Sequence, residues 1–139
     1  MDILFVAGFS VITTDPGAEK DLFVEALGLP LQPPPGMPDS EYVYSESIPG
    51  AKHLGVWPLS DAAQSCFGKD AWPDSHPVPQ ATIEFEVADV EGAAQELVGR
   101  GYTLVHPTRT EPWQQTIARF QASDGLLIAV CSTPGLSED

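Results

Sequence analysis

Acidic, imidazole and aromatic side chains alternate with apolar ones along several short segments of this 139-residue chain. Successive side chains of a strand point to opposite faces. Each segment therefore predicts one apolar face that packs under helices, with Phe9, Val11, Leu54, Val56, Ile83, Phe85, Ile128 and Val130. The other face carries the chemical groups, with Ser10, Ile12, His53, Trp57, Glu84, Glu86, Leu127 and Cys131. Aromatic rings beside carboxylates bind planar or cationic small molecules, and a carboxylate whose pKa is raised by burial can abstract a proton.

The candidate ligand-binding residues combine this second face with aromatic side chains of nearby segments. They are Tyr42, Tyr44, His53, Trp57, Glu84, Glu86, Trp113 and Phe120. Apolar walls with a few polar groups are typical of a small-molecule pocket. Other interpretations stay open, since Glu84 and Glu86 can lie on a solvated sheet face and Trp57 can belong to the core. Arg119, one of six basic residues, is expected to pair with a strand carboxylate, or else with a substrate anion.

The segments that position these residues occur twice, 74 residues apart. Residues 9–15 and 83–89 are each a short strand that ends in Asp and runs into a helical stretch, and residues 53–57 fall on residues 127–131. A repeat of this kind predicts a pseudo-symmetric fold whose site can be searched for in pairs. The same shift relates Tyr42, Tyr44 and Glu46 to Thr116, Ala118 and Phe120. Phe120 is therefore expected to share a face with the tyrosines.

Each half is predicted to have the order strand, helix, strand, strand, strand, which gives an α+β fold. Asp15 and Asp89 are the predicted N-caps of the two helices. The predicted strands cover residues 3–14, 41–47, 51–57, 81–88, 102–106, 114–121 and 126–132. Residues 32–40 form a proline-rich loop where the first half would have its second strand. Residues 58–79 connect the halves through a short helix and an extended linker.

The acidic composition limits the partners that the chain can take. Lys and Arg number 6 against 20 Asp and Glu, for a formal net charge of −14. A surface of this charge repels phosphate backbones and anionic membranes, so we expect neither nucleic-acid nor membrane binding. No apolar stretch approaches the roughly 20 residues of a membrane span, and residues 1–10 lack a secretion signal, which predicts a cytoplasmic protein. Cys66 and Cys131 have no metal-type spacing and are expected to be reduced thiols.

The order and spacing of four segments resemble the glyoxalase/bleomycin-resistance/dioxygenase superfamily, also called vicinal oxygen chelate proteins. These segments are residues 8–28, 82–101, 110–113 (Thr-Glu-Pro-Trp) and 118–128. The resemblance covers nearly the whole chain and implies two β-α-β-β-β modules that form a cup-shaped, partly open barrel, often within a homodimer. It implies one domain over residues 1–139, with module 1 at about 3–57, a linker at 58–79 and module 2 at about 80–132.

The resemblance also implies a divalent metal in the cup, held by the first and last strands of each module. The four corresponding positions are Gly8, Gly55, Thr82 and Ala129. Zinc, iron and manganese sites need imidazole, thiolate or carboxylate ligands, so we predict a cup without a metal or other cofactor. Sliding the alignment by two residues brings in Ser10, His53, Trp57 and Glu84, a set that still lacks a convincing ligand constellation. The small residues either leave room for a ligand on the cup floor or serve close strand packing.

The module pattern is otherwise complete, but the four positions carry no metal-ligating side chains. This combination favours a metal-independent small-molecule binding protein. The resemblance points to the bleomycin-resistance branch, which gives antibiotic resistance by sequestering a drug in the cleft of a dimer. The alternative is a glyoxalase- or dioxygenase-like enzyme, a lyase or isomerase, that uses Glu84, Glu86 or an unrecognised metal site. A third hypothesis is a regulatory or structural dimer that uses the fold as an interface. We expect the ligand to be aromatic or cationic.

Overall fold

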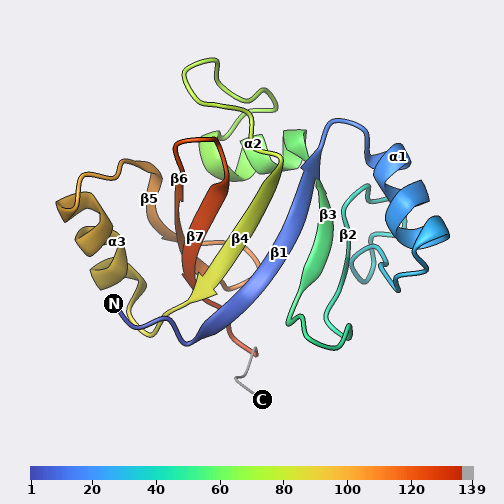
Figure 1. Ribbon diagram of the computed structural model, residues 1–139, viewed down its shortest axis with the longest axis horizontal. Coiled ribbons are helices and arrows are strands. Elements are labelled where there is room, and N and C mark those ends of the chain that lie inside the picture. The colour runs from blue at the N-terminus through green and yellow to red at the C-terminus, as the bar shows by residue number, and fades with distance from the viewer. Residues whose placement is uncertain (136–139) are drawn as a thin grey trace.

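The computed structural model describes residues 1–135, whose strands form one open seven-stranded sheet (Figure 1). The strands are β1 (Phe5–Thr13), β2 (Val43–Ser45), β3 (Leu54–Pro58), β4 (Ala81–Glu86), β5 (Leu104–Thr110), β6 (Thr116–Gln121) and β7 (Leu127–Ser132), in the order β2-β3-β1-β4-β7-β6-β5. The described helices are α1 (Pro16–Lys20), η1 (Asp21–Ala26), α2 (Leu59–Phe67) and α3 (Val90–Gly99), and none of them is long and apolar enough to cross a membrane. The predicted α+β fold with a cupped, partly open sheet is confirmed.

The two halves of the chain meet at β1 and β4, which pair antiparallel in the middle of the sheet. β3 runs parallel to β1, and β7 runs parallel to β4. Phe9 pairs with Leu54, and 74 residues later Ile83 pairs with Ile128. The predicted repeat therefore holds at the level of strand register, and the two modules pair within one chain.

The first module contributes three strands to the sheet and the second contributes four. β2 is three residues long, and Gln32 and Tyr44 form an isolated bridge beside it. Three prolines, at positions 33 to 35, follow Gln32, and a proline has no N–H with which to extend a ladder. The proline-rich loop thus lies where the first module would have its second strand, as the sequence indicates.

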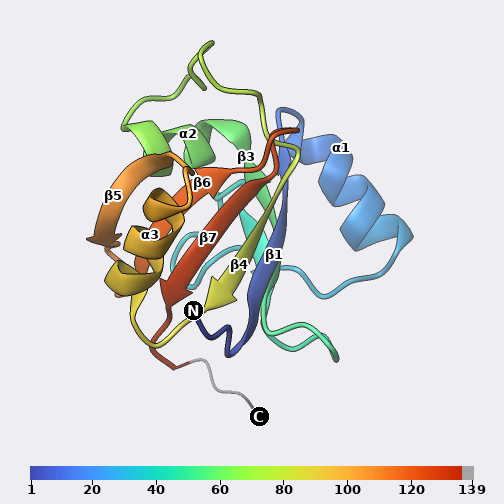
Figure 2. The same cartoon turned by 60° about the vertical axis from the view of Figure 1, so that its left-hand side comes forward.

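Helices cover the outer, convex face of the sheet at its two ends. The carboxylate of Asp15 accepts a hydrogen bond from Ala18 N at 3.1 Å, and that of Asp89 accepts one from Gly92 N at 3.0 Å. Both predicted N-caps are confirmed, and they satisfy N–H groups that the start of a helix leaves without a partner. α3 packs its apolar side chains on β6 and β7, while η1 packs on β2 and β3 (Figure 2).

The middle of the convex face lies bare between these helices. Val6 and Phe9 on β1 are 48% and 40% exposed. The prediction that Phe9 packs under a helix is wrong, because η1 and α3 sit over the outer strands of the sheet and leave β1 and β4 uncovered. Exposed apolar surface of this kind is typical of an interaction site.

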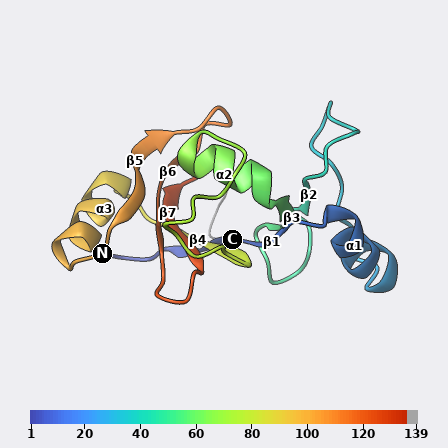
Figure 3. The same cartoon turned by 90° about the horizontal axis from the view of Figure 1, so that it is seen from above.

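The segment that joins the modules covers part of the concave side. α2 lies in the hollow of the curved sheet (Figure 3), and its buried Ala62 and Ala63 belong to one apolar cluster with Ile12 of β1. Trp72 is buried and packs edge-on against Phe67 at the end of α2. The predicted short helix is confirmed. The rest of the connection folds back against α2, so the prediction of an extended linker is wrong.

Candidate functional site

Strand register gathers the chemical groups of the concave face into two neighbouring rows. The first row runs Gly8–Glu84–Ala129–Arg119 across β1, β4, β7 and β6. The second row runs Gly55–Ser10–Thr82–Leu127 across β3, β1, β4 and β7. Residues directly opposite one another on paired strands share a face of the sheet. All four positions that correspond to metal ligands in the superfamily therefore lie together on the concave face.

These four positions do not fit a divalent metal. A Cβ added to Gly8 would lie 3.3 Å from the Cβ of His53, and one added to Gly55 would lie 3.2 Å from Cε1 of Tyr42. His53 and Tyr42 thus occupy the space above the two glycines, and the glycines serve close packing rather than an open floor. The other two positions supply at most one neutral hydroxyl. Among residues 1–135, no three His, Cys, Asp or Glu side chains converge as a metal site.

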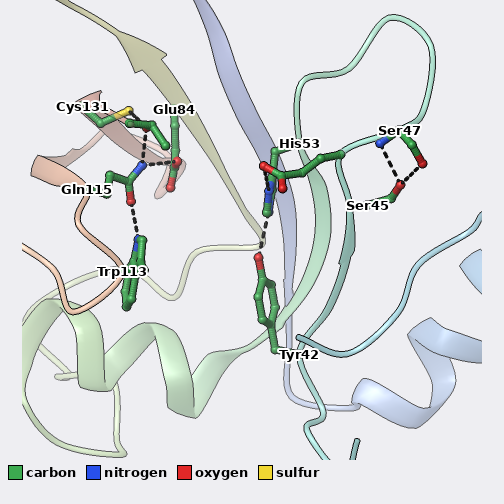
Figure 4. A network of polar contacts seen from close by, with 10 residues as sticks. Tyr42, Ser45, Ser47, His53, Glu84, Trp113, Gln115 and Cys131 are labelled. Carbon is green, nitrogen blue, oxygen red and sulfur yellow. Dashed lines mark hydrogen bonds and ion pairs between the residues drawn. The ribbon is translucent and has the colours of Figure 1, made fainter. Parts of the chain in front are cut away.

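Tyr42, Tyr44 and His53 form a half-buried stack of rings on the β2–β3 side of the concave face. The ring centroid of Tyr44 lies 5.2 Å from that of Tyr42 and 5.0 Å from that of His53, at interplanar angles of 15° and 13°. The hydroxyl oxygen of Tyr42 is 2.8 Å from Nε2 of His53 (Figure 4). Nδ1 of His53 lies 3.9 Å from a carboxylate oxygen of Glu46. The stack therefore offers a flat aromatic surface beside negative charge.

Burial sets the protonation of this stack. It lowers the pKa of His53, against the opposing effect of the carboxylates of Glu84 and Glu46, so the ring is neutral at pH 7. Burial, followed by the charge of Glu84, raises the pKa of Tyr42. Tyr42 therefore keeps its proton, and its hydroxyl shares a hydrogen bond with Nε2 of the neutral His53 ring, in which the tautomer of the imidazole decides the donor.

Glu84 belongs to a second network, with the loop that leads into β6 (Figure 4). Nε2 of Gln115 donates to Oε1 of Glu84 at 3.0 Å, and Oε1 of Gln115 accepts from the indole N–H of Trp113 at 2.8 Å. Gln115 is 5% exposed, whereas Trp113 is 54% exposed. A buried amide thus holds a carboxylate at one end and an accessible indole at the other.

Glu86 is more deeply buried than Glu84, and its carboxylate forms hydrogen bonds within the protein near the end of β7. It is 7% exposed, and one of its oxygens accepts a hydrogen bond from Thr133 N at 2.8 Å. The interpretation of Glu86 as part of a solvated face is wrong, because its carboxylate is used inside the protein. Sγ of Cys131 donates to the other oxygen at 3.7 Å, and burial, with the charge of Glu84 second, raises the pKa of Cys131 to about 12. Cys131 and Cys66 are both free and buried.

Arg119 is a fully buried cation on the same face. Its side chain is 1% exposed, its guanidinium carbon lies 5.7 Å from the ring centroid of the half-buried Trp57, and its Nη1 is 3.1 Å from Nε2 of His106. Oε1 of Glu111 lies 3.5 Å from Nη1 of Arg119 and 2.9 Å from Nε of Arg109. Arg119 pairs with a carboxylate, but Glu111 lies in the turn after β5 and not on a strand as predicted. The contact is long, however, and the carboxylate is shared with a second arginine.

The prediction that Phe120 faces the cup is wrong. Tyr44 lies opposite Gly55, and the residue opposite Ala129, the repeat partner of Gly55, is Arg119. The repeat spacing is therefore 75 residues at this strand rather than 74, and a slip of one residue turns every side chain to the other face. Phe120 packs under α3 on the convex side, and Arg119 takes its place in the cup.

The structure brings most of the other predicted residues together. His53 packs against Gly8 and Glu84 lies opposite it, while Tyr42 packs against Gly55 and Tyr44 lies opposite Gly55. Trp113 is linked to Glu84 through Gln115, and Trp57 packs with the cluster under α2. Sequence reasoning missed Glu111 and Gln115. The available signal was the position of both residues two places from Trp113, a predicted ligand-binding residue.

Comparison with known proteins agrees with this geometry at the level of the fold. No protein-family model matches the chain, and no curated protein matches it. Solved structures match over nearly the full chain. A glyoxalase/bleomycin resistance protein/dioxygenase superfamily member from Vibrio splendidus 12B01 is 18% identical, with a TM-score of 0.58 over 92% of this chain and 97% of that one. A methylmalonyl-CoA epimerase in complex with methylmalonyl-CoA and NH4+ is 14% identical, with a TM-score of 0.59 over 98% and 99%.

A third match carries a different function in its name. An NAD-dependent benzaldehyde dehydrogenase from Legionella pneumophila is 11% identical, with a TM-score of 0.57 over 91% of this chain and 97% of that one. At such identities the likeness shows the fold alone, and the chemistry has to be argued from the side chains of the site.

Proposed function

Because the chain has the fold of the glyoxalase/bleomycin resistance/dioxygenase superfamily, we propose that it binds a small molecule on its concave face without a metal. The supporting observation is what occupies the metal-ligand positions of the superfamily. His53 and Tyr42 fill the space above Gly8 and Gly55. A face built in this way presents aromatic rings and carboxylates to a ligand, and it offers no donor set for a Lewis acid.

The ligand that suits this face is planar and cationic. Tyr44 and His53 supply a flat aromatic surface, and the negative charges of the Glu46 and Glu84 carboxylates interact electrostatically with His53. Trp113 offers an accessible indole beyond Glu84. A cation over an aromatic face gains about 0.5–2 kcal/mol, depending on how far it is desolvated. The net charge of −14 also raises the local concentration of cations.

Within the superfamily, we propose the drug-sequestering role of the bleomycin-resistance branch. Titration with a panel of aromatic and glycopeptide antibiotics tests this role, with tryptophan fluorescence as the signal because Trp113 is exposed beside the Glu84 network. We expect at least one cationic compound to bind and to change the emission. The absence of binding by every compound at high micromolar concentration rejects drug sequestration.

Two charge-matched variants locate the binding site. Glu84→Gln removes one negative charge from the concave face, and we expect it to weaken a cationic ligand about tenfold, which corresponds to roughly 1.4 kcal/mol. Glu25→Gln removes the same charge from an exposed position on η1, on the convex side, and should leave the Kd unchanged. Equal weakening by the two variants would point to overall charge and would contradict a site at Glu84.

Proton transfer is a second candidate function, and one arrangement favours it. Glu84 lies opposite Gly8 on one side, and His53 packs against Gly8 on the other. A neutral imidazole and a carboxylate around one position are what general acid–base chemistry requires. Each bound compound can be incubated with the protein in D2O and followed by proton NMR. Loss of a C–H signal that depends on His53 supports an enzyme, and unchanged spectra leave binding as the function.

We also propose that the chain forms a homodimer through the bare strip on the convex face. Val6 and Phe9 supply apolar surface there, and burial of apolar surface drives association. Sedimentation velocity should give a dimer for the wild type and a monomer for Phe9→Lys. A monomeric wild type at micromolar concentration would contradict this proposal.

A further inference from the structure

We infer that Gln115 is a positioning residue of the concave face, which fixes the carboxylate of Glu84 and the indole of Trp113 and so sets the preference of the site for a cation. The inference rests on the proposed binding function and adds the residue that decides its specificity. It is carried by the three hydrogen bonds of one buried amide, by the left-handed turn at Gln114, and by the exposure of the two side chains that the amide holds.

The buried amide of Gln115 has a hydrogen-bond partner for each of its polar groups. Its carbonyl oxygen accepts from Nε1 of Trp113 at 2.8 Å. Its nitrogen donates to Oε1 of Glu84 and to Oγ1 of Thr133, both at 3.0 Å. An amide nitrogen carries two hydrogens, and both are used here. A buried network in which every member is satisfied holds its side chains in one arrangement.

The indole of Trp113 decides which way this amide points. An indole N–H can only donate, so it requires the carbonyl oxygen of Gln115 on its side and leaves the NH2 group to face Glu84. The amide cannot turn over without setting its oxygen against the oxygen of Glu84. A carboxylate is acceptor-only when it is ionised. The arrangement therefore suits a negatively charged Glu84, which is the form that attracts a cation.

The turn between β5 and β6 brings Trp113 and Gln115 together. Gln114 has a φ of 73°, in the left-handed region that is uncommon for a residue other than glycine. Gln114 N donates to the carbonyl oxygen of Glu111 at 2.9 Å, and Glu111 N donates to that of Gln115 at 2.8 Å. A backbone conformation of this kind persists where the surrounding structure fixes it, and it is concentrated at functional sites.

The two side chains that the amide holds are open to a ligand. Trp113 is 54% exposed, and Glu84 is half-buried, so both are reached from solvent without an internal cavity. Within residues 1–135, Gln115 is the hydrogen-bond partner of Glu84 and occupies Oε1, which leaves Oε2 for a cationic group (Figure 4). A planar cation that contacts the indole and the carboxylate finds both already ordered, and binding does not have to order them.

The coupling between Glu84 and Trp113 is measured first in the protein without a ligand. The indole N–H signal of Trp113 in an NMR spectrum is identified by its loss in Trp113→Phe. We expect Glu84→Gln to shift this signal, because the amide relays the change of charge to the indole hydrogen bond, and Glu25→Gln on η1 to leave it in place. In a Gln115→Met background, Glu84→Gln should no longer shift it. An unshifted signal in Glu84→Gln, or a shift that persists in that background, would overturn the inference and leave the binding function untouched.

Isothermal titration calorimetry then measures the preference for a cation. The probes are 9-aminoacridine, a planar cation at pH 7, and acridine, the neutral parent ring system. We expect the wild type to bind the cation about tenfold more tightly. Gln115→Met removes the three hydrogen bonds at nearly constant side-chain length, so it should weaken the cation alone and reduce the preference to about twofold. Gln95→Met is the matched control, because it removes a hydrogen bond to Glu91 from an exposed position on α3, and it should keep the tenfold preference of the wild type.

Gln115→Asn gives a second reading of the same preference if the methionine variant fails to fold. It keeps the amide but is one methylene shorter, so it cannot span from Trp113 to Glu84. A preference that survives these substitutions, or equal weakening of both compounds, would overturn the inference, since equal weakening indicates a structural role. Binding of an antibiotic but of neither acridine would do the same and leave the binding function standing. Failure of the antibiotics and of both acridines would remove the binding function and the role of Gln115 together.

Discussion

Replacing Gly55 by Ala tests whether the superfamily's metal-ligand positions serve aromatic packing in this protein. The new Cβ would lie 2.9 Å from Oγ of Ser10, 3.2 Å from Cε1 of Tyr42 and 3.3 Å from the carbonyl oxygen of Val43. The first contact is closer than real Cβ atoms tolerate, and the carbonyl belongs to a paired strand that cannot retreat freely. Overpacking of this kind costs about 1–3 kcal/mol, and removing Gly from the unfolded chain returns about 0.4–1 kcal/mol. We expect a net loss of roughly 1–2 kcal/mol.

Urea unfolding measures this loss, because a change in midpoint at constant m reports stability. For m near 2 kcal/mol/M the midpoint should fall by about 0.5–1 M. Displacement of the Tyr42 ring should also break its hydrogen bond to His53 and let the pKa of His53 rise towards its ordinary value, which an NMR titration follows. Unchanged stability together with an unchanged pKa of His53 would refute the packing argument.

Two further glycines act as internal controls for this experiment. Gly8→Ala meets only the flexible side chain of His53, at 3.3 Å and beyond, so its loss should be smaller, below about 1 kcal/mol. Gly99 ends α3 with no atom within 4 Å of an added Cβ. Gly99→Ala should therefore be neutral or stabilising by up to about 1 kcal/mol.

Three other predictions concern acid stability, helix capping and fluorescence. The pKa of His106 is lowered to about 4, against a value near 6.5 in the unfolded chain, so the contribution of the neutral ring to stability is complete above pH 6.5. This contribution, at most about 3 kcal/mol, is lost as the pH falls from 6.5 towards 4. His106→Gln should therefore flatten the pH dependence of the urea midpoint in this range, and parallel pH profiles of variant and wild type would contradict the prediction. Asp89→Ala removes the cap on Gly92 N and should lower the free energy of unfolding by about 1 kcal/mol, whereas wild-type stability would show the cap to be unimportant. Trp113→Phe removes an exposed indole and should shift the emission maximum to shorter wavelength, because the remaining indoles are buried or half-buried; an unshifted spectrum argues against an exposed Trp113.

Alternation along the strands predicts the face of some residues of the candidate site correctly and the face of others wrongly. Alternation on a strand decides the face of each side chain and so predicts a shared face for His53, Glu84 and Tyr44. In the structure His53 packs against Gly8, Glu84 lies opposite Gly8, and Tyr44 lies opposite Gly55. Phe120 was assigned to the wrong face, because the repeat spacing of 75 at β6 depends on an extra residue that no periodicity marks.

The primary structure alone is enough to predict the α+β class, the duplicated modules, both helix caps and the absence of ligating side chains at the four superfamily positions. These follow from residue type and from spacing along the chain, which are local quantities. Packing in three dimensions places Tyr42 and His53 over the glycine positions, brings α2 into the cup and buries Arg119 there with an incompletely matched charge. Each of these depends on side-chain volume, strand register and charge in three dimensions, where residues far apart in the chain compete for the same space.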